Sequence, residues 1–384
     1  MKKTIYLDHA ATTPVSRSVL EAMLPYFSDC PGNASAVYGA GREARKAVEK
    51  ARKQAAAAIG AEPREILFTS GGSESDNLAL KGTAFALKDR GRHLITSAIE
   101  HPAVLNTCRW LEKQGFDVTY IQPDSKGMIS PDKVRDAVRN DTILISVMAA
   151  NNEIGTIEPV ADIGAIAHEK GILFHTDAVQ AVGSIPVNVN EWNADLLSIS
   201  AHKFYGPKGT GVLFIRRGTR IDNLIHGGEQ ERGLRAGTEN VAGIAGLGRA
   251  IEEATARLEE SAKKNAYLRD RLLHGILDHI PDVKLNGPEA GRLPNNCSIC
   301  FDRIDGEALL LRLDLAGIAA SSGSACTAGS QEISHVLRAV GLTEKEARGS
   351  LRLTTGADNT EEEIDESIRI LSEIVEDLRL MYHG

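Results

Sequence analysis

Short apolar runs recur along the first part of the chain, and stretches with helical spacing separate several of them. The spacing predicts helices over residues 75–87, 103–113 and 160–169, and a further helix over 41–60 that Gly60 ends. Strands that alternate with helices are typical of a largely parallel sheet with helices on both faces. The seven predicted strands are residues 65–70, 93–97, 117–121, 142–148, 172–176, 196–200 and 211–215.

The pattern changes after residue 215. Apolar positions at helical spacing run from 242 to 280, and this length predicts either one helix that passes between two domains or two joined helices. A strand-like region follows, and the last helix begins with the capping box Thr360-Glu-Glu-Glu363 and has one apolar face. We therefore predict a domain boundary near residues 255–265.

Length and composition agree with more than one domain. The chain has 384 residues, and a single core stops growing at about 250–300 residues. Hydrophobic residues make up 42% and charged residues 25%, as in an ordinary globular protein. The chain has 44 Lys and Arg residues and 52 Asp and Glu residues, so its net charge is −8. This charge excludes nucleic-acid binding through bulk positive charge.

The N-terminus and the cysteines bear on location and metal binding. The start lacks a signal-like segment and no apolar run is long enough to span a bilayer, so we expect a cytoplasmic protein without a membrane span. The odd number of five cysteines favours a reducing compartment. Cys297-Ser-Ile-Cys300 matches a redox or zinc pair, but residues i and i+3 of a strand point to opposite faces and no second pair of ligands exists. We interpret both as structural cysteines and predict no metal site.

Two predicted strands end in residues that are suited to binding a charged ligand. The first is followed by Thr69-Ser-Gly-Gly-Ser-Glu-Ser75, and glycines and hydroxyls at a helix N-terminus form an anion site. A plain turn with Ser73 as helix cap is equally consistent with this segment. Asp177 follows the fifth strand, where a buried carboxylate needs a cation or several donors, although a helix cap is a common alternative.

The sixth strand ends in Ser200-Ala-His-Lys203. A lysine at the mouth of an apolar strand is a candidate desolvated amine that can bond covalently to a carbonyl group, although most lysines are merely solvated. The Ser-x-x-Lys pattern of penicillin-binding proteins is rejected, because its S-D-N and K-T-G companions do not occur. An anion site, a buried Asp and a strand-end Lys together are what pyridoxal phosphate requires: a phosphate cradle, a partner for the pyridine nitrogen and an amine.

With these segments in view, the chain resembles the cysteine desulfurases of the NifS/IscS type, which are fold type I pyridoxal-phosphate enzymes, from end to end. The resemblance implies a seven-stranded, mostly parallel sheet in a large cofactor-binding domain (15–260) and a smaller α+β domain (1–14 and 261–384). The matching segments include Tyr6-Leu-Asp-His-Ala-Ala-Thr-Thr-Pro14, Gly32-Asn33, Asn151-Asn-Glu-Ile-Gly155, 175–180, 200–211, 226–241, 321–327 and Leu351-Arg352.

The resemblance also implies roles for individual residues. Lys203 would bind pyridoxal 5'-phosphate covalently, His101 would stack on its ring and move protons, and Asp177 would pair with the ring nitrogen. The other expected cofactor contacts are Gly72, Ser73, Asn152, Gln180, Ser200, His202 and, from a second subunit, Thr238. The expected substrate contacts are Asn33, Asn152 and Arg352, with Arg352 gripping the substrate carboxylate through two hydrogen bonds.

Cys326 lies among small residues in Ser321-Ser-Gly-Ser-Ala-Cys-Thr-Ala-Gly-Ser330. The resemblance implies that its thiolate takes sulfur from L-cysteine, leaving L-alanine and a persulfide that passes to an iron–sulfur scaffold protein of the IscU/NifU type or to another acceptor, such as a thiolation enzyme. An ordinary thiol, with a pKa of about 8.5, is mostly protonated at neutral pH, so the site must assist its ionisation. The chance presence of a linker cysteine is the alternative that the resemblance disfavours.

Other functions remain open at this point. A selenocysteine lyase or an aminotransferase on the same fold would not need Cys326, and a non-catalytic partner subunit would need neither Cys326 nor Lys203. The chain departs from the family pattern at a few positions: Tyr38 for the frequent His, Ala34 for Pro, Ser73 for Thr, and Glu229 for a third Gly. The resemblance further implies a homodimer.

Overall fold

The computed structural model describes residues 4–322 and 333–381 and contains all seven predicted strands in one sheet. The strand order is β2-β8-β7-β6-β5-β3-β4, and every neighbouring pair is parallel except the two that involve β8. The predicted mostly parallel α/β sheet is therefore confirmed. The strands are β2 (Ile66–Thr69), β3 (His93–Ser97), β4 (Asp117–Ile121), β5 (Thr142–Ser146), β6 (Leu173–Asp177), β7 (Leu196–Ser200) and β8 (Gly211–Ile215).

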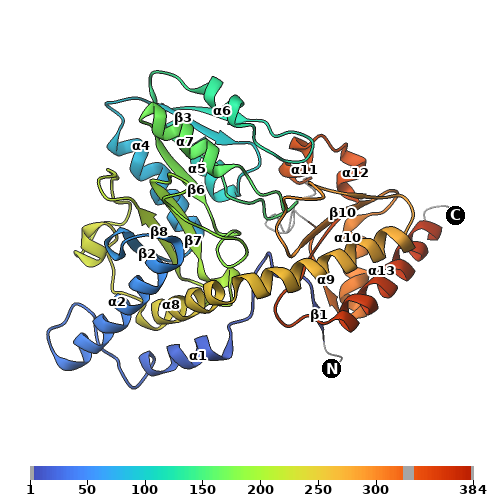
Figure 1. The fold of residues 1–384 in the computed structure, drawn as a ribbon, viewed down its shortest axis with the longest axis horizontal. Coiled ribbons are helices and arrows are strands. Elements are labelled where there is room, and N and C mark those ends of the chain that lie inside the picture. Colours follow the sequence, from blue (N-terminus) through green and yellow to red (C-terminus); the bar gives the residue numbers. More distant parts are fainter. Residues whose placement is uncertain (1–3, 323–332, 382–384) are drawn as a thin grey trace.

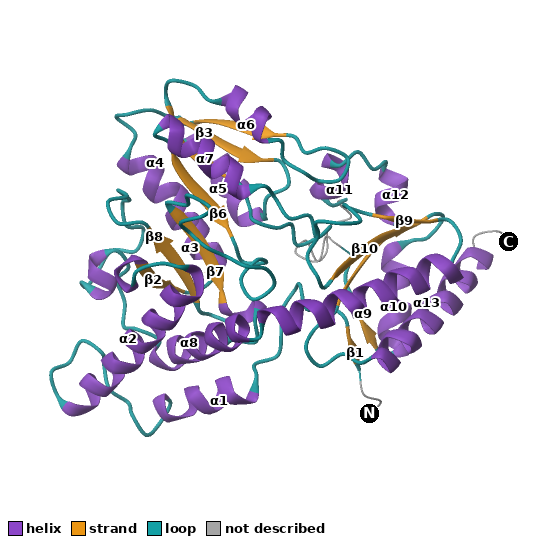
Figure 2. Ribbon diagram, viewed as in Figure 1, coloured by secondary structure: helices purple, strands orange, loops and turns teal. Residues whose placement is uncertain are grey.

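Alternation along the strands sends side chains to two apolar layers. On β8, Leu213 packs with α3 (Gly72–Asn77), its continuation through a π-helical turn and α4 (Thr83–Ala86), and with α5 (Pro102–Lys113). Val212 and Phe214 belong to the layer on the other face. That layer holds α2 (Gly39–Ile59), α6 (Pro131–Ala137), α7 (Val160–Lys170) and α8 (Val241–Ala256). Figures 1 and 2 show this sheet enclosed by helices.

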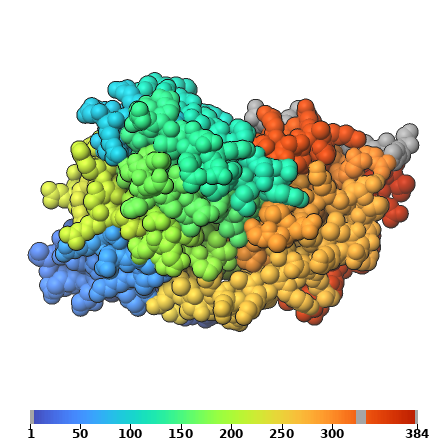
Figure 3. All heavy atoms as spheres, turned by 45° about the horizontal axis from the view of Figure 1, so that its top comes forward, coloured from blue at the N-terminus to red at the C-terminus, as the bar shows by residue number. Residues whose placement is uncertain are grey.

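The long helical pattern over 242–280 forms two joined helices, which was one of the two predicted alternatives. Helix α8 ends and α9 (Leu258–His279) begins at Arg257, whose φ of −109° and ψ of 14° are not helical. Helix α8 packs on α1 (Arg17–Met23) and α2, whereas α9 packs on α13 (Glu361–Met381). In Figure 3 the gold atoms of this segment run along the lower edge between the two ends of the molecule.

A second apolar cluster lies around a small antiparallel sheet, β12-β10-β9. The strands are β9 (Val283–Leu285), β10 (Asn296–Phe301) and β12 (Ser350–Thr354), covered by α9, α10 (Gly306–Ala316) and α13. Near the N-terminus, β1 (Ile5–Tyr6) pairs with β11 (Ile318–Ala319), so Leu7 joins this cluster. We propose this cluster as the core of the predicted smaller domain.

Two short helices, α11 (His335–Ala339) and α12 (Glu344–Arg348), lie between β11 and β12 in the sequence. Val336, Leu337 and Ala347 pack into the large-sheet cluster rather than into the smaller one. The segment that follows the predicted cysteine loop is therefore held against the large sheet. The predicted domain limits, 15–260 with 1–14 and 261–384, stay a prediction.

The paired cysteines lie on β10. Cys297 belongs to the smaller cluster, and the Cys300 thiol lies 3.3 Å from the Asn286 side chain. Burial raises the pKa of both thiols to about 11, which keeps them protonated at neutral pH. In the described residues, no His, Cys, Asp and Glu group has a metal-binding arrangement, and no helix has the length and apolarity to cross a membrane.

Candidate active site

The predicted anion cradle lies where β2 passes into α3. Gly71 precedes the helix with a φ of 148°, a conformation that side chains rarely adopt, and a Cβ on Gly72 would lie 2.8 Å from Val179 Cγ2. Only glycines fit here, so the free N–H groups of the first turn stay accessible to an anion. The interpretation of Ser73 as helix cap is wrong, because Gly71 holds that position and Ser73 lies exposed in the first turn.

The predicted lysine lies in the short turn after β7. The Lys203 Nζ donates to the carbonyl oxygens of Ala10, at 2.6 Å, and Ala11, at 2.8 Å. Gln180 Nε2 also donates to the Ala10 oxygen, at 3.0 Å. The N-terminal segment therefore closes over Lys203 and Gln180, and brings together residues that are distant in sequence.

Asp177 is the last residue of β6 and is only 5% exposed. Its Oδ1 accepts from the Val179 N–H at 2.9 Å, and no other hydrogen bond to this carboxylate forms within the described residues. Burial raises the pKa of Asp177, whereas the nearby His101 and Lys203 lower it. Asp177 is thus a buried carboxylate with room for a cationic partner, as a pyridinium nitrogen would supply.

His101 is the N-cap of α5, so the helix start fixes its ring. Its Nδ1 accepts from the Ala103 N–H at 3.1 Å, which places the proton of the neutral ring on Nε2. Burial lowers the pKa of His101, so the ring is neutral near pH 7. The electrostatic interactions of His101 with Asp177 and Lys203 confirm that the three groups are neighbours.

Beneath Asp177 lies a polar network that the sequence interpretation missed. His175, two residues earlier on β6, contacts Ser146 Oγ at 2.8 Å and Ser198 Oγ at 3.0 Å, and its Nε2 lies 3.6 Å from Asp76 Oδ1. Burial lowers the pKa of His175 to about 3, and burial together with the Asp177 charge raises the pKa of Asp76 well above its usual value. His175 is therefore neutral at pH 7, and burial favours the neutral form of Asp76. The period-two alternation of β6 was the available signal, since it places His175 and Asp177 on one face.

Of the remaining predicted phosphate contacts, Ser200 lies next to the glycines of the anion cradle, His202 follows it after β7, and Thr238 lies elsewhere in the sequence. Ser200 Oγ is 3.7 Å from the position of a Cβ on Gly71. His202 Nδ1 contacts Thr12 Oγ1 at 3.1 Å, and burial, with Lys203 and Lys208 nearby, lowers the pKa of His202 to about 4. Thr238 is exposed in the segment that precedes α8, as expected for a residue predicted to act in a second subunit.

The predicted substrate contacts are only partly assembled. Arg352 on β12 donates from Nη1 to the backbone oxygen of Asn152 at 3.1 Å and from Nη2 to Asp8 Oδ1 at 2.8 Å. Asn33 is exposed before α2, and its side chain accepts from the Ser35 N–H in its own turn. Sequence interpretation missed Asp8 as a partner of Arg352, although it lies within the matching N-terminal motif.

Cys326 lies outside the described residues, but the residues on either side of its segment return to the site. Ser321 pairs with Arg352 through two backbone hydrogen bonds, of 2.6 and 3.2 Å. Ser334 Oγ donates to the buried Glu153 carboxylate, and His335 Nε2 contacts the backbone oxygen of Glu100 at 2.9 Å. Both flanks of the predicted cysteine loop are therefore fixed next to Arg352 and His101.

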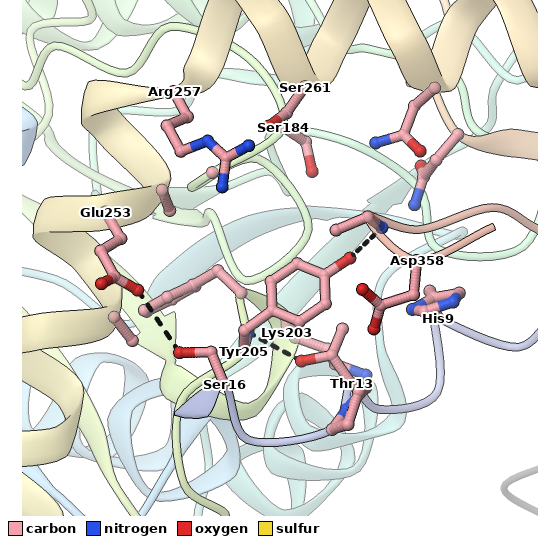
Figure 4. A pocket seen from close by; sticks show the side chains of 18 of the residues that line it. His9, Thr13, Ser16, Ser184, Lys203, Tyr205, Glu253, Arg257, Ser261 and Asp358 are labelled. Carbon is pink, nitrogen blue, oxygen red and sulfur yellow. Dashed lines mark hydrogen bonds between the residues drawn. The ribbon is translucent and has the colours of Figure 1, made fainter. Parts of the chain in front are cut away.

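A cavity of 470 Å³ lies on one side of Lys203, between the N-terminal segment, the α8–α9 junction and residues 355–358. Figure 4 shows His9, Thr13 and Tyr205 around it, with the Tyr205 hydroxyl accepting from the Ala357 N–H at 2.7 Å. The glycine cradle, the Asp177 carboxylate and the Lys203 amine lie at the carboxyl ends of parallel strands, where such sheets bind ligands. These residues fit pyridoxal phosphate.

The comparisons with known proteins agree with this geometry. The family model of the class-V aminotransferases matches residues 5–366. The chain belongs to the class-V aminotransferase family. Enzymes of this family that desulfurate cysteine depend on pyridoxal phosphate, so the cofactor predicted from the strand ends is confirmed.

Within the class-V aminotransferases, the relatives of this chain carry consistent names. It is 56% identical over 379 residues to a cysteine desulfurase IscS of Methanosarcina thermophila, which covers 99% of this chain and 94% of that protein. A cysteine desulfurase IscS of Dictyoglomus turgidum is 53% identical, with 99% and 96% covered. The predicted resemblance to IscS-type proteins is thereby confirmed.

Solved structures of similar proteins extend the match to the fold. A NifS-like protein has a TM-score of 0.92 at 41% identity, covering 97% of this chain and all of that one. SspA in complex with cysteine has a TM-score of 0.83 at 41% identity, covering 92% and 99%. The predicted fold type I architecture is thus confirmed.

Proposed function

We propose that this class-V aminotransferase homologue is a cysteine desulfurase that converts L-cysteine to L-alanine and leaves the sulfur as a persulfide on Cys326. The observation that carries this proposal is the match of 99% of the chain, at 56% identity, to a protein named cysteine desulfurase. The site supports it, because it offers a cofactor lysine, a buried carboxylate and an arginine for a substrate carboxylate. Pyridoxal phosphate would be held by Lys203 and Asp177 and would act as an electron sink for the substrate carbon.

The residues of the chain divide the remaining work. Arg352 binds the substrate carboxylate and orients the amino acid toward Lys203. The Lys203 amine takes and returns the substrate α-proton, and the Nε2 proton of neutral His101 is available for transfer to the carbon that loses the sulfur. The Cys326 thiolate attacks the substrate sulfur, so an S–S bond forms while the C–S bond breaks. The carbon receives a proton in place of the sulfur. L-Cysteine and the Cys326 thiol thus give L-alanine and a persulfide on Cys326.

The same proposal includes location and partners. Thr238 lies exposed on the surface, which supports its contribution to the cofactor site of a second subunit in a homodimer. The persulfide passes to an iron–sulfur scaffold protein of the IscU/NifU type or to another sulfur acceptor, with no direct nucleic acid and no membrane involved. We place the protein in the cytoplasm. A selenocysteine lyase, an aminotransferase or a non-catalytic partner remains the alternative, and Cys326 with Lys203 argues against each.

Two variants separate the roles of the cofactor lysine and the cysteine. Cys326→Ala is expected to keep the absorbance of the bound cofactor but to release no sulfur from L-cysteine, because only the sulfur acceptor is missing. Lys203→Ala is expected to lose the covalent link, which borohydride reduction and peptide mass spectrometry detect in the unaltered protein. Sulfur transfer by the Cys326→Ala variant would refute the proposed role of Cys326.

A further inference from the structure

Arg352 is a buried cation whose hydrogen bonds are incomplete. The Arg352 side chain is 4% exposed, and of its five N–H donors one meets Asp8 and one meets the Asn152 oxygen. Its Nε is buried and has no hydrogen-bond partner among the described residues. A buried N–H without an acceptor is costly, so this edge of the guanidinium is ready for a further acceptor such as a substrate carboxylate.

Asp8 is held next to Arg352 by the backbone on both of its sides. The Thr354 N–H donates to the Leu7 oxygen at 2.7 Å, and the Ala10 N–H donates to Thr354 Oγ1 at 2.9 Å. Thr354 is two residues after Arg352 on the same strand, so Asp8 and Arg352 lie on adjacent backbones. The Asp8 carboxylate therefore stays beside the guanidinium when a second carboxylate arrives.

The same N-terminal segment also contacts Lys203. Ala10 and Ala11 accept from Lys203 Nζ, and Asp8 precedes Ala11 by only three residues. Three residues span at most about 10 Å, so one short segment contacts both the Arg352 guanidinium and the Lys203 amine. An α-amino acid with its carboxylate on Arg352 would thus have Asp8 as a close third charge.

We propose that Asp8 competes with bound carboxylates for Arg352 and so keeps the affinity for substrate and product low. The inference rests on the proposed function, because it takes Arg352 as the carboxylate site. Two carboxylates that share one guanidinium carry a net charge of −1 and repel each other. Product release benefits, because L-alanine carries the same carboxylate and leaves more readily.

A different role for Asp8 predicts the opposite sign. If Asp8 only orients Arg352, removal of its charge loosens the guanidinium and weakens carboxylate binding. If Asp8 competes, its removal frees Arg352 and strengthens binding. The direction of the change in affinity therefore distinguishes competition from orientation.

The test compares Asp8→Asn, which keeps an oxygen for Nη2 but removes the charge, and Asp8→Ala, which removes both. The matched control is Asp365→Asn, which breaks an exposed ion pair with Arg271. Calorimetry with L-alanine and, on cofactor-free protein, with propionate measures affinity without turnover, and alanine formation gives KM and kcat for L-cysteine. Thermal melting confirms that each variant folds. If only one of the two Asp8 variants folds, its affinities alone decide the test.

Competition predicts that both Asp8 variants bind L-alanine and propionate about three- to tenfold more tightly, with a KM for L-cysteine lowered by a similar factor. The control variant should match the unaltered protein. Weaker or unchanged binding in both variants would overturn the inference. Failure of the unaltered protein to form alanine would instead refute the proposed function and leave the propionate result to judge Asp8.

Discussion

At the scale of single residues, the site places one buried carboxylate beside a lysine and a histidine, with a second buried carboxyl behind it. Asp177 faces Lys203 and His101, whereas Asp76 is wholly buried, and burial raises the pKa of Asp76 well above its usual value. Strand-end position was enough to predict Asp177 and Lys203, because parallel sheets gather their strand ends. It was not enough for Asp76 or His175, whose partners come from different strands and a helix.

The raised pKa of Asp76 leads to a paired prediction. Asp76→Asn should change kcat less than about threefold, because burial already favours the form of Asp76 that carries no charge. Asp177→Asn should lower kcat by at least about a hundredfold, because the cofactor ring loses its anionic partner. Steady-state alanine formation by the two variants measures both. Equal damage from both substitutions would show that Asp76 is ionised and acts as a second anion.

A buried carboxyl also gives a pH-dependent prediction. Glu158 Oε2 accepts from the Ile129 N–H at 2.8 Å, and Oε1 has no hydrogen-bond partner in the part of the chain that the structure describes. Burial raises the pKa of Glu158 to about 8. The unfolded chain loses this proton near pH 4.5 while the folded protein keeps it, so the Glu158 contribution to stability falls as pH rises from about 4.5 to 8. Glu158→Gln should therefore stabilise the protein at pH 8 by at least about 1 kcal/mol.

Denaturant unfolding at pH 8 and pH 5 checks this. The gain from Glu158→Gln should be much smaller at pH 5, which lies well below the folded-state pKa of about 8 and only just above the ordinary value of 4.5 in the unfolded chain. Glu376→Gln on the exposed face of α13 serves as the control and should show no such dependence. A gain that is equal at both pH values would contradict a raised pKa.

At the scale of elements, Gly248 of α8 allows close packing on α2. A Cβ on Gly248 would lie 2.7 Å from the Ala51 Cα and Cβ, so the two helices meet through backbone-sized residues. Apolar periodicity predicted both helices, and it left open whether 242–280 was broken. The break at Arg257 depends on packing against two different partners, α2 and α13, which a single helical pattern does not contain.

Helix propensity alone predicts that Gly248→Ala stabilises the protein, whereas the close contact with α2 predicts that it destabilises the protein. Gly248→Ala should lower the free energy of unfolding by about 1–3 kcal/mol, because the added methyl group pushes α8 off α2. Gly39→Ala, at the exposed start of α2, is the control and should be neutral or slightly stabilising, since its nearest neighbour would be 3.9 Å away. Unfolding by urea measures both, and a stabilised Gly248→Ala protein would refute the close contact.

At the scale of the whole molecule, one chain does not assemble every predicted contact. Asn33 and Thr238 are exposed, the Asn33 side chain bonds within its own turn, and Cys326 lies outside the described residues. No sequence pattern within one chain places a residue that acts in a second chain, so only the family resemblance pointed to Thr238. The seven-stranded sheet, by contrast, followed from apolar runs alone.

A shared site in the proposed homodimer can be tested with mixed subunits. Thr238→Val should lower cofactor affinity when both chains carry it, because a phosphate contact is lost. A mixed dimer of Lys203→Ala and Thr238→Val chains should bind one cofactor at ordinary affinity if Thr238 serves the partner's site, because the unaltered Lys203 then meets an unaltered Thr238. Weak binding in the mixed dimer would place Thr238 in its own chain's site instead. Cofactor titration of affinity-separated mixed dimers measures this.

The most direct test of the central claim follows both products of L-cysteine. Purified protein with bound cofactor is incubated with L-cysteine and a reductant, and alanine and sulfide are quantified over time. Without reductant, the peptide that contains Cys326 is examined for one added sulfur atom. A cysteine desulfurase gives equal molar amounts of alanine and sulfide and a persulfide on Cys326. Formation of a keto acid in place of alanine, or alanine without sulfur on Cys326, would contradict the account.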